Sequence, residues 1–558
     1  MSTEKSTKQK INIKESDIES AEKVLGVEYT KNERLQMVNN LEGQIMSAKL
    51  RRQTDLNNSI PMATKFDPRL PGFSMPAETG YVPSDIDFKL PDEEEDIAFA
   101  TIVQQGYLIK KGLISSRKLT EIYLNRIEKS QENLECFATI TKEQALGEAD
   151  AMDSLTRAGI NLGPLHGIPY GLKDLFDTKE VTTGWGAEPY QNRVPHSDAT
   201  IVKKLRAAGA VMIGKTTLGA LAYNDIWYGG RTRNPWNLEE GSSGSSAGSA
   251  SATAAGLCSF AIGTETLGSI TSPSQRCGTT GLRPTFGRVS RSGAMALCWS
   301  LDKVGPICRC VEDTGLVLSI INGFDRDDMG SIDAPFQFNA KDSIDGLTVG
   351  YLPEAFKAGA TKIDKKSLNA VKDLGMKVVE VELDDLPYMS LINILYAEAA
   401  AAFEHLTLTG DDDTLTWQDE GAWPNTFRKA RFLSAVDHVQ LERLRYLTMR
   451  SLNKLFDKID VLIGPFDTGP GPMLVASNFT GHPCLHMRAG FDRLATRGAA
   501  SLSNGKLNTG ESGGGKKLRV PHGISLWGKL FEEGKILNLG MALEAKLNVW
   551  KDRPSIRI

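Results

Sequence analysis

The sequence predicts an α/β fold, built on a mostly parallel or mixed sheet with helices packed against it. The chain has 558 residues, of which 41% are hydrophobic, enough to bury a large core. Between residues 345 and 465, segments with strand patterns alternate with segments with helix patterns. A long central stretch rich in Gly and Ala favours one large catalytic unit over the several domains that length alone would allow.

The first 58 residues are predicted to form a helical extension. Ser16 with Glu19, and Thr30 with Glu33, fit the capping box, in which two side chains satisfy free N–H groups at a helix start. Residues 59–95 hold six prolines and run into the acidic stretch DEEED, so they are predicted to form an extended arm. The arm wraps either the catalytic body or a second copy of the chain in a homodimer, and a disordered linker is the alternative.

The catalytic domain is predicted to span residues 96–558 and to open with a helix at 116–127. A later helix pattern covers residues 366–374, and strand patterns cover residues 347–352, 377–383 and 459–463. Residues 503–517, rich in Gly and Lys, are predicted to be a mobile loop.

Composition excludes several classes of protein. The formal net charge is −4 and the isoelectric point is about 6.1, with no basic patch, so a nucleic-acid partner is not expected. Seven cysteines without disulfide-like spacing favour a reducing, cytoplasmic location. Cys308 and Cys310 have no second pair at zinc-site spacing, so no metal is expected. A polar N-terminus and the lack of a long apolar run predict neither a signal peptide nor a membrane span.

Three short blocks carry the strongest chemical signal. GIPYGLKD (residues 167–174) precedes the run GSSGSSAGSASATAAG (241–256), which is followed by GTETLGSITSP (263–273). A serine hydroxyl needs a base to become a nucleophile, and a lysine can serve when burial lowers its pKa. Small residues let backbone segments approach closely, and the turn at 266–269 directs several N–H groups toward one point, as an oxyanion requires. These residues predict hydrolysis of an amide without histidine.

The same blocks resemble the amidase signature family of hydrolases from about residue 95 to about residue 550. Flanking pieces share the resemblance: AGAVMIGKT (208–216), RNPWN (233–237), GLRPTFG (281–287) and NFTGHP (478–483). The family fold implies a mixed central sheet covered by helices on both faces. The 24-position step from Ser245 to Ser269 agrees with the family spacing.

The resemblance also implies roles for individual residues. Ser269 is the expected nucleophile, Ser245 the serine preceded by a cis peptide bond, and Lys173 the base. Lys173 takes a proton from Ser245, which takes one from Ser269, and Ser246 orients the lysine. The oxyanion hole is expected from the backbone N–H groups of Thr266, Leu267, Gly268 and Ser269.

The chain departs from the family pattern around the nucleophile. The usual Asp-x-Gly-Gly-Ser is replaced by ETLGS, which begins at Glu265, and Thr271 stands where an arginine is usual. The acid–arginine pairing is then expected to be lost or to be supplied by Arg276. Leu267 removes one glycine's conformational freedom from the turn. These changes bear on substrate range and loop geometry more than on the type of reaction.

Two other motifs compete with this interpretation. GAVMIGKT, which begins at Gly209 and includes Lys215 and Thr216, matches a phosphate loop and would make the chain a nucleotide-binding protein. Its four middle residues are apolar, however, and predict a strand that follows a helix over residues 198–208. GSSAG (244–248) matches a nucleophile elbow centred on Ser246, with His482, His486 or His522 as the histidine, but it leaves Ser269 and Lys173 unexplained.

The chain is therefore predicted to be an amidase that cleaves a carboxylic amide to an acid and ammonia or an amine, without a cofactor. The glutaminase subunit of a tRNA-dependent amidotransferase is the alternative, because it shares these motifs, although it usually lacks so long an N-terminal extension. Specificity is expected from residues 385–450 and 470–490. An apolar acyl pocket is expected from Tyr223, Trp227, Phe403 and Trp417.

Overall fold

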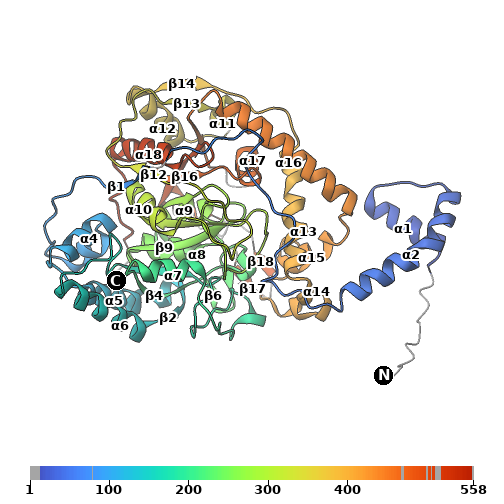
Figure 1. Ribbon diagram of the computed structural model, residues 1–558, viewed down its shortest axis with the longest axis horizontal. Helices are drawn as coiled ribbons and strands as arrows, with labels where there is room; N and C mark the ends of the chain where they lie inside the picture. The colour runs from blue at the N-terminus through green and yellow to red at the C-terminus, as the bar shows by residue number, and fades with distance from the viewer. Residues whose placement is uncertain are drawn as a thin grey trace.

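The computed structural model describes residues 13–77, 79–357, 359–466, 471–497, 501–503, 506–508 and 517–555. Its centre is an eleven-stranded mixed sheet (Figure 1). The strands, in spatial order, are β14 (Lys377–Glu380), β13 (Thr348–Tyr351), β15 (Val461–Pro465), β19 (Leu518–Gly528), β16 (Cys484–Leu494), β10 (Thr280–Arg283), β11 (Lys303–Cys308), β9 (Phe260–Glu265), β3 (Pro169–Lys173), β4 (Val211–Thr216) and β2 (Phe137–Ile140).

The sheet contains two groups of parallel strands, separated by strands that pair antiparallel. Strands β13, β14 and β15 are parallel, as are β3, β4 and β9, while the strands between the two blocks pair antiparallel. The residues of β3, β4 and β9 are buried throughout. The predicted mixed α/β sheet is thus confirmed, and the three buried parallel strands form its centre near the chemistry.

Helices cover both faces of the sheet. Successive strand residues point to opposite faces: Leu485 of β16 lies against Gly540 of α18 (Glu533–Leu547), whereas Gly281, the cross-strand partner of His486, lies against Ser274 of α9 (Thr271–Cys277). Helix α8 (Ala247–Ala254) packs beside α9, and α10 (Val311–Ile321) and α12 (Lys362–Asp373) pack beside α18.

The remaining helices surround this layered core. They are α3 (Glu94–Phe99), α4 (Ile102–Lys110), α5 (Ser116–Leu134), α6 (Lys142–Arg157), α7 (Thr200–Ala207), α11 (Pro353–Lys357), α13 (Ile392–Ala402), α14 (Glu404–Thr409), α15 (Trp423–Ala430), α16 (Ala435–Phe456) and α17 (Pro472–Phe479). Short strand pairs join β5 (Ile226–Trp227) to β6 (Gly230–Arg231), β7 (Arg233–Asn234) to β8 (Asn237–Gly241), and β17 (Ser501–Ser503) to β18 (Lys506–Asn508). The helices and strands expected at 116–127, 347–352, 366–374, 377–383 and 459–463 are confirmed, with ends that differ by a few residues.

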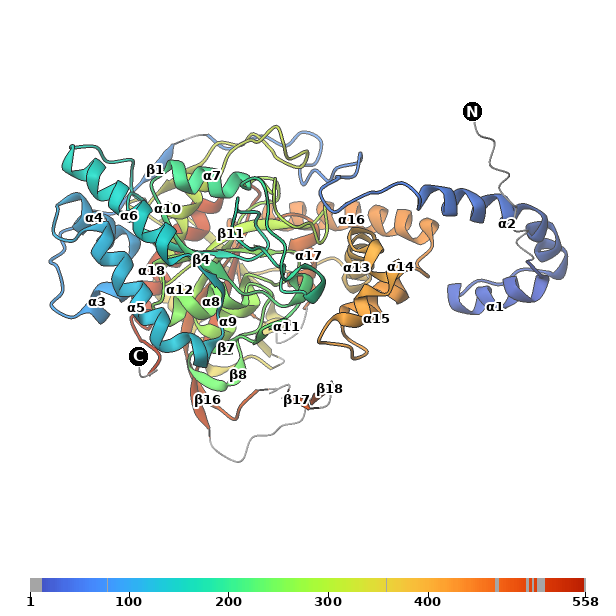
Figure 2. The same cartoon turned by 90° about the horizontal axis from the view of Figure 1, so that it is seen from below.

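The N-terminal extension begins with two helices, α1 (Glu15–Leu25) and α2 (Lys31–Arg51), which project from the rest of the molecule (Figures 1 and 2). The capping box at Thr30 is confirmed, since its backbone N–H donates to Glu33 at 2.6 Å. The box expected at Ser16 is wrong. Helix α1 starts two residues earlier, because the Asp17 carboxylate accepts the Lys14 backbone N–H at 2.8 Å and leaves Ser16 inside the first turn.

The proline-rich arm runs along the catalytic body of the same chain. Its β1 (Gly80–Val82) pairs in parallel with β12 (Gln337–Asn339), and the ring of Phe66 lies 3.5 Å from the Arg445 guanidinium. The division of the chain at residues 58 and 95 stays a prediction. Much of the loop predicted at 503–517 lies outside the described residues, and within it residues 506–508 form β18.

Candidate active site

The candidate site lies where two buried parallel strands end. Lys173 is the last residue of β3 and Glu265 is the last residue of β9, and these strands are neighbours in the sheet. Because the carboxyl ends of parallel strands meet at one edge, the lysine block and the second serine block converge there. Lys173 and Glu265 are both fully buried.

The serine run enters this edge between β8 and α8. A cis peptide bond joins Gly244 to Ser245, as the resemblance implied. A Cβ atom on Gly244 would lie 1.8 Å from the Asn224 carbonyl oxygen, and one on Gly248 would lie 2.1 Å from the Cys136 carbonyl oxygen. Only glycine permits such close approach of two backbone segments, which explains why the run is made of such small residues.

Lys173 donates hydrogen bonds to two hydroxyl groups on this run and to one on β9. Its Nζ lies 2.8 Å from Ser245 Oγ, 3.1 Å from Ser246 Oγ and 2.8 Å from Thr264 Oγ1. Burial holds the pKa of the Lys173 ammonium well below its ordinary value, although the carboxylates of Asp302 and Glu265 act in the opposite direction. The site therefore favours the neutral amine, which is the form able to accept a proton.

Ser269 lies beside Ser246, in the turn between β9 and α9. The Ser246 backbone N–H donates to the Ser269 carbonyl oxygen at 3.1 Å. Within the described ranges, the Ser269 hydroxyl has no hydrogen-bond partner, and the side chain is 7% exposed. Ser245 and Lys173 are thus in direct contact, whereas the Ser269 hydroxyl is left free to meet a ligand.

The turn that precedes Ser269 presents backbone N–H groups. Gly268 has a φ of +84°, which glycine adopts without strain. In the part of the chain that the structure describes, the N–H groups of Thr266, Leu267, Gly268 and Ser269 donate to no acceptor. These four groups are the ones that the resemblance assigns to an oxyanion hole.

Glu265 fixes the chain on the other side of Ser269. Its Oε2 accepts the backbone N–H groups of Ile270 and Thr271, each at 2.9 Å. Its Oε1 accepts from Arg283 Nη1 at 2.7 Å and from Asn478 Nδ2 at 3.1 Å. Burial by itself would raise the pKa of Glu265, but the Arg283 charge and these hydrogen bonds lower it to about 2.

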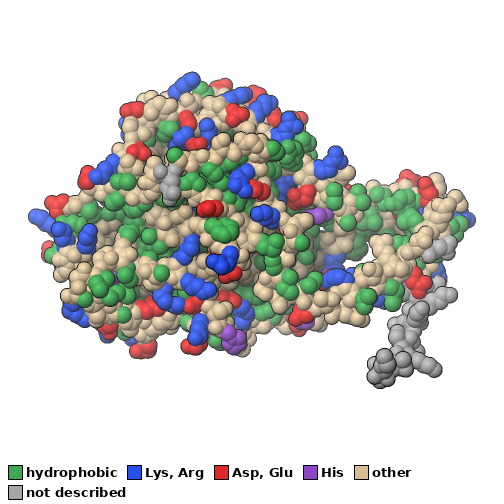
Figure 3. All heavy atoms as spheres, in the orientation of Figure 1, with side chains coloured by type: hydrophobic (Ala, Val, Ile, Leu, Met, Phe, Trp, Pro, Cys, Tyr) green, Lys and Arg blue, Asp and Glu red, His purple; other side chains and the backbone are tan. Residues whose placement is uncertain are grey.

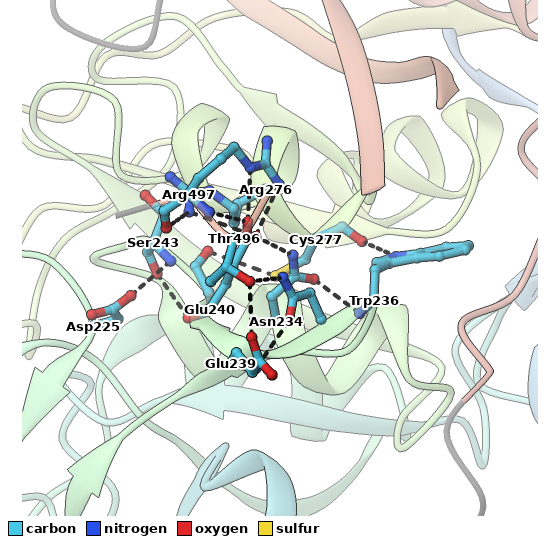
Figure 4. A network of polar contacts seen from close by, with 12 residues as sticks. Asp225, Asn234, Trp236, Glu239, Glu240, Ser243, Arg276, Cys277, Thr496 and Arg497 are labelled. Carbon is cyan, nitrogen blue, oxygen red and sulfur yellow. Dashed lines mark hydrogen bonds and ion pairs between the residues drawn. The ribbon is translucent and has the colours of Figure 1, made fainter. Parts of the chain in front are cut away.

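The expectation that Arg276 would replace the missing arginine is wrong. Arg276 instead lies 3.7 Å from Glu240, a buried carboxylate that also receives three hydrogen bonds from Arg497 (Figure 4). Arg276 stands near the end of α9, at a different carboxylate, whereas Arg283 on β10 reaches Glu265 directly. The block that contains Arg283 was visible in the sequence, but only folding brings it to the acid.

Sequence reasoning missed a second buried lysine at this edge. Lys303 begins β11 opposite Glu265, and its Nζ donates to the carbonyl oxygens of Leu301 and Thr266. Burial lowers the pKa of Lys303 to about 7. A lysine directly before the apolar strand VGPIC was the signal that could have revealed it.

The phosphate-loop match is a buried strand. Residues 211–216 form β4, as the apolar pattern predicted, and Lys215 Nζ donates to Phe176 O and Thr183 Oγ1, both at 2.7 Å. The amine also lies 3.7 Å from Asp174. A phosphate loop needs open backbone and a free lysine, and the strand provides neither.

The nucleophile-elbow interpretation also lacks its histidine. His482, His486 and His522 hydrogen-bond to Thr480, Ser525 and Asp364 respectively. Across the described residues, none of the three bonds to the Ser246 hydroxyl, which is occupied by Lys173 and the Thr264 backbone.

The structure separates the four residues that were expected to line an acyl pocket. Tyr223, Trp227 and Trp417 line a cavity of only about 10 Å³, and Tyr223 stacks on Trp417 at 4.9 Å between ring centres. Phe403 is 1% exposed and stacks on Phe427 at 5.8 Å, so it belongs to the core beneath α13 and α15.

A much larger cavity, of about 670 Å³, includes Thr264 and Thr266 in its wall. Those two residues join it to Lys173 and to the turn before Ser269. Among the described residues, none of its lining comes from 385–450 or 470–490, and the assignment of specificity to those segments stays a prediction.

Three features of the described residues bear on other functions. They contain no group of three or more His, Cys, Asp or Glu side chains placed to hold a metal ion. None of the helices described is both long enough and apolar enough to cross a membrane. On the face shown in Figure 3, basic and acidic side chains are interspersed.

Comparison with known proteins identifies the family of this chain. The model of the Amidase family matches residues 118–537. This chain belongs to the amidase family. A glutamyl-tRNA(Gln) amidotransferase subunit from Ruthia magnifica is 32% identical over 486 residues, covering 79% of this chain and 95% of the relative. The corresponding protein from Pseudomonas savastanoi pv. phaseolicola is 34% identical over 468 residues, covering 78% and 95%.

A solved structure of the peptide amidase from Stenotrophomonas maltophilia has a TM-score of 0.67 and 26% identity to this amidase. The match covers 82% of this chain and 98% of that one. Family and neighbours together make this amidase an enzyme that hydrolyses C–N amide bonds.

Proposed function

We propose that the amidase hydrolyses a carboxylic amide through an acyl-enzyme on Ser269, with Ser245 and Lys173 as its proton relay. The observation that carries the proposal is the 2.8 Å hydrogen bond between the buried Lys173 amine and Ser245 Oγ. A base that is neutral and already in contact with a bridging hydroxyl supplies what a serine nucleophile lacks.

In the first half-reaction, Ser269 Oγ attacks the amide carbonyl carbon. Its proton passes to Ser245, whose own proton passes to Lys173. The carbonyl oxygen becomes an oxyanion, and the unpaired N–H groups of the turn at 266–269 would stabilise it. The C–N bond then breaks, and the relay returns a proton to the departing amine.

In the second half-reaction, water attacks the ester on Ser269. The relay takes a proton from this water and returns one to the Ser269 oxygen as the acid leaves. Ser246, at 3.1 Å from Lys173 and bonded to the Thr264 backbone, holds the amine toward Ser245 and is a positioning residue.

Covalent labelling tests the nucleophile. A fluorophosphonate should add one phosphonyl group to the wild-type protein, detected by intact mass, and Ser269→Ala should abolish the addition. Lys173→Met should slow it by at least about 100-fold, since an acid–base group typically contributes 10²–10⁴-fold. Labelling that persists in Ser269→Ala would overturn the assignment and would direct attention to Ser246.

The glutaminase subunit is a second candidate, because the sequence relatives named above are amidotransferase subunits. Such a subunit would release ammonia from glutamine and work with other chains. Assaying the purified chain alone against glutamine and against a panel of aliphatic, aryl and peptide amides separates the two. Turnover of non-glutamine amides by the isolated chain supports the amidase, and turnover of glutamine only with added partner subunits supports the alternative.

A further inference from the structure

The large cavity beside the catalytic centre has one wall that lies outside the family match. Residues 57–66, where the helical extension meets the proline-rich arm, line it with Asn58, Met62 and Phe66, and Thr264 and Thr266 also belong to its lining. The family match begins at residue 118. The extension therefore adds a wall to a chamber whose other walls belong to the catalytic domain.

The wall is fixed in place at two points. The Phe66 ring lies 3.5 Å from the Arg445 guanidinium and 5.1 Å from the Phe286 ring centre. Asn58 makes a reciprocal pair with the backbone of Ala296: its Nδ2 donates to the carbonyl oxygen and its Oδ1 accepts the N–H, each at 2.8 Å. Such paired contacts hold a segment without secondary structure in one position.

The second anchor is connected to the turn before Ser269. The residues after Ala296, Leu297 and Cys298, donate their N–H groups to Asp302 Oδ2 at 2.8 and 3.0 Å. Asp302 Oδ1 in turn accepts from Thr266 Oγ1 at 2.6 Å. A continuous set of hydrogen bonds thus leads from the arm to the residue that begins the turn.

The lining of the chamber is mixed, with apolar and polar parts of similar extent. Its buried lining includes Leu175, Trp185, Ala222, Met295, Leu297 and Val304. Four of the charged side chains in the wall form two ion pairs, Arg193 with Asp177 and Arg291 with Asp328. A volume of about 670 Å³ lies within the range of pockets that hold drug-sized ligands, well above the size of a two-carbon amide.

We propose that residues 57–66 form a specificity wall of the substrate chamber, with Met62 limiting the size of the acyl group bound there. This inference rests on the proposed function, because it assumes that the group carried by Ser269 occupies the chamber. Met62 is partly buried and lines the cavity, so a larger side chain at this position removes volume and a smaller one adds it.

The test compares two fluorophosphonate probes, one with a methyl group and one with a long alkyl group, on Met62→Trp and Met62→Ala. The ratio of long-chain to methyl labelling rates should fall at least about tenfold in Met62→Trp and rise in Met62→Ala, since pocket size discriminates typically by 10–200-fold per methylene. Met46→Trp, on the projecting helix α2 and 46% exposed, is the matched control and should leave the ratio unchanged.

A second pair of variants tests the anchor. Asn58→Ala should make the labelling rate depend less on the chain length of the probe, because the change releases the wall from Ala296. Asn40→Ala, on the surface of α2, should leave that dependence unchanged. A ratio within about twofold of wild type in both Met62 variants, when both unfold at the wild-type temperature, overturns the proposal. If the ratio is unchanged but Ser269→Ala loses all labelling, the proposed function stands and only the specificity wall is refuted. Labelling that persists in Ser269→Ala overturns both proposals.

Discussion

Replacing Glu265 by Gln tests whether the buried carboxylate holds the catalytic turn. The carboxylate accepts two backbone N–H groups through Oε2, from Ile270 and Thr271, and the side chains of Arg283 and Asn478 through Oε1. The amide of glutamine has one oxygen, which accepts hydrogen bonds, and one NH₂ group, which donates them. Either the two backbone N–H groups or the two side-chain donors would then face the NH₂ group instead of an acceptor. The guanidinium of Arg283 would also lose its buried counter-charge.

Two routes give the size of the effect. Removing one partner of a buried ion pair typically costs about 3–5 kcal/mol. Independently, the pKa of Glu265 falls from its ordinary 4.5 to about 2. At about 1.4 kcal/mol per unit, that difference corresponds to about 3 kcal/mol of folding stability. The free energy of unfolding of Glu265→Gln should therefore be about 3 kcal/mol below wild type at pH 7.

The pH dependence of this difference has a definite sign. Because the folded protein binds the Glu265 proton less tightly than the unfolded chain does, its contribution is complete above about pH 4.5 and is lost as the pH falls toward 2. The gap between wild type and Glu265→Gln should narrow over that interval. Urea unfolding followed by tryptophan fluorescence at several pH values measures it.

A matched variant separates stability from catalysis. Glu533 is as buried as Glu265 and accepts from Arg288 Nε and the Thr285 backbone N–H, both at 2.9 Å, far along the chain from the serine blocks. Glu533→Gln should lose comparable stability yet label with fluorophosphonate at the wild-type rate, whereas Glu265→Gln should lose both. A loss below about 1 kcal/mol in Glu265→Gln, or equal labelling in the two variants, would refute the reasoning.

Four further outcomes follow from the same contacts. Because burial lowers the pKa of Lys173, the labelling rate should rise with pH as the ammonium loses its proton and level off well below pH 10.5; a flat profile from about pH 4 to about pH 10 contradicts the base. Gly244→Ala should reduce labelling by at least about 100-fold, since its Cβ would lie 1.8 Å from Asn224 O and displace the serine run; a folded, active variant contradicts this. Lys215→Met should destabilise the fold by about 1–3 kcal/mol, and calorimetry should detect no binding of ATP with magnesium to either form; binding to wild type alone would restore the phosphate loop. Lys303→Met should keep the midpoint of the wild-type pH profile, and a shifted midpoint would make Lys303 part of the relay.

The contacts that were predictable from the sequence are those that a short motif encodes. The contact of Lys173 with Ser245 was expected because the blocks that hold them resemble the amidase signature motifs, and the structure brings the two residues together at one sheet edge. The partner of Glu265 could not, because Arg276 is nearer in sequence but α9 carries it to Glu240. The path of helix α9 decides which carboxylate Arg276 reaches, and the composition of the segment does not reveal that path.

Pocket residues were harder to predict for a different physical reason. Aromatic residues fill cores as readily as they line pockets, and Phe403 follows an apolar helix whose buried face it extends. The larger chamber is lined by irregular segments, including residues 57–66 and the loop around Ala296, which have no periodicity to indicate which side chains face inward. Their placement depends on specific contacts such as the Asn58 pair, which only the folded chain reveals.

Three buried lysines lie at or near one edge of the sheet, and a lowered pKa does not tell which of them is the base. Burial lowers the pKa of Lys173, of Lys215 to about 8 and of Lys303 to about 7. Their hydrogen-bond partners differ in kind. Lys303 meets carbonyl oxygens, which carry no proton to release. Lys215 meets a carbonyl oxygen, the Thr183 hydroxyl and the Asp174 carboxylate, none of which belongs to the serine run. Within the described chain, Lys173 is the one whose amine contacts seryl hydroxyls, and one of these belongs to the residue after the cis bond. A neutral amine becomes a catalytic base only where its neighbour can release a proton toward the reaction, and that condition selects Lys173.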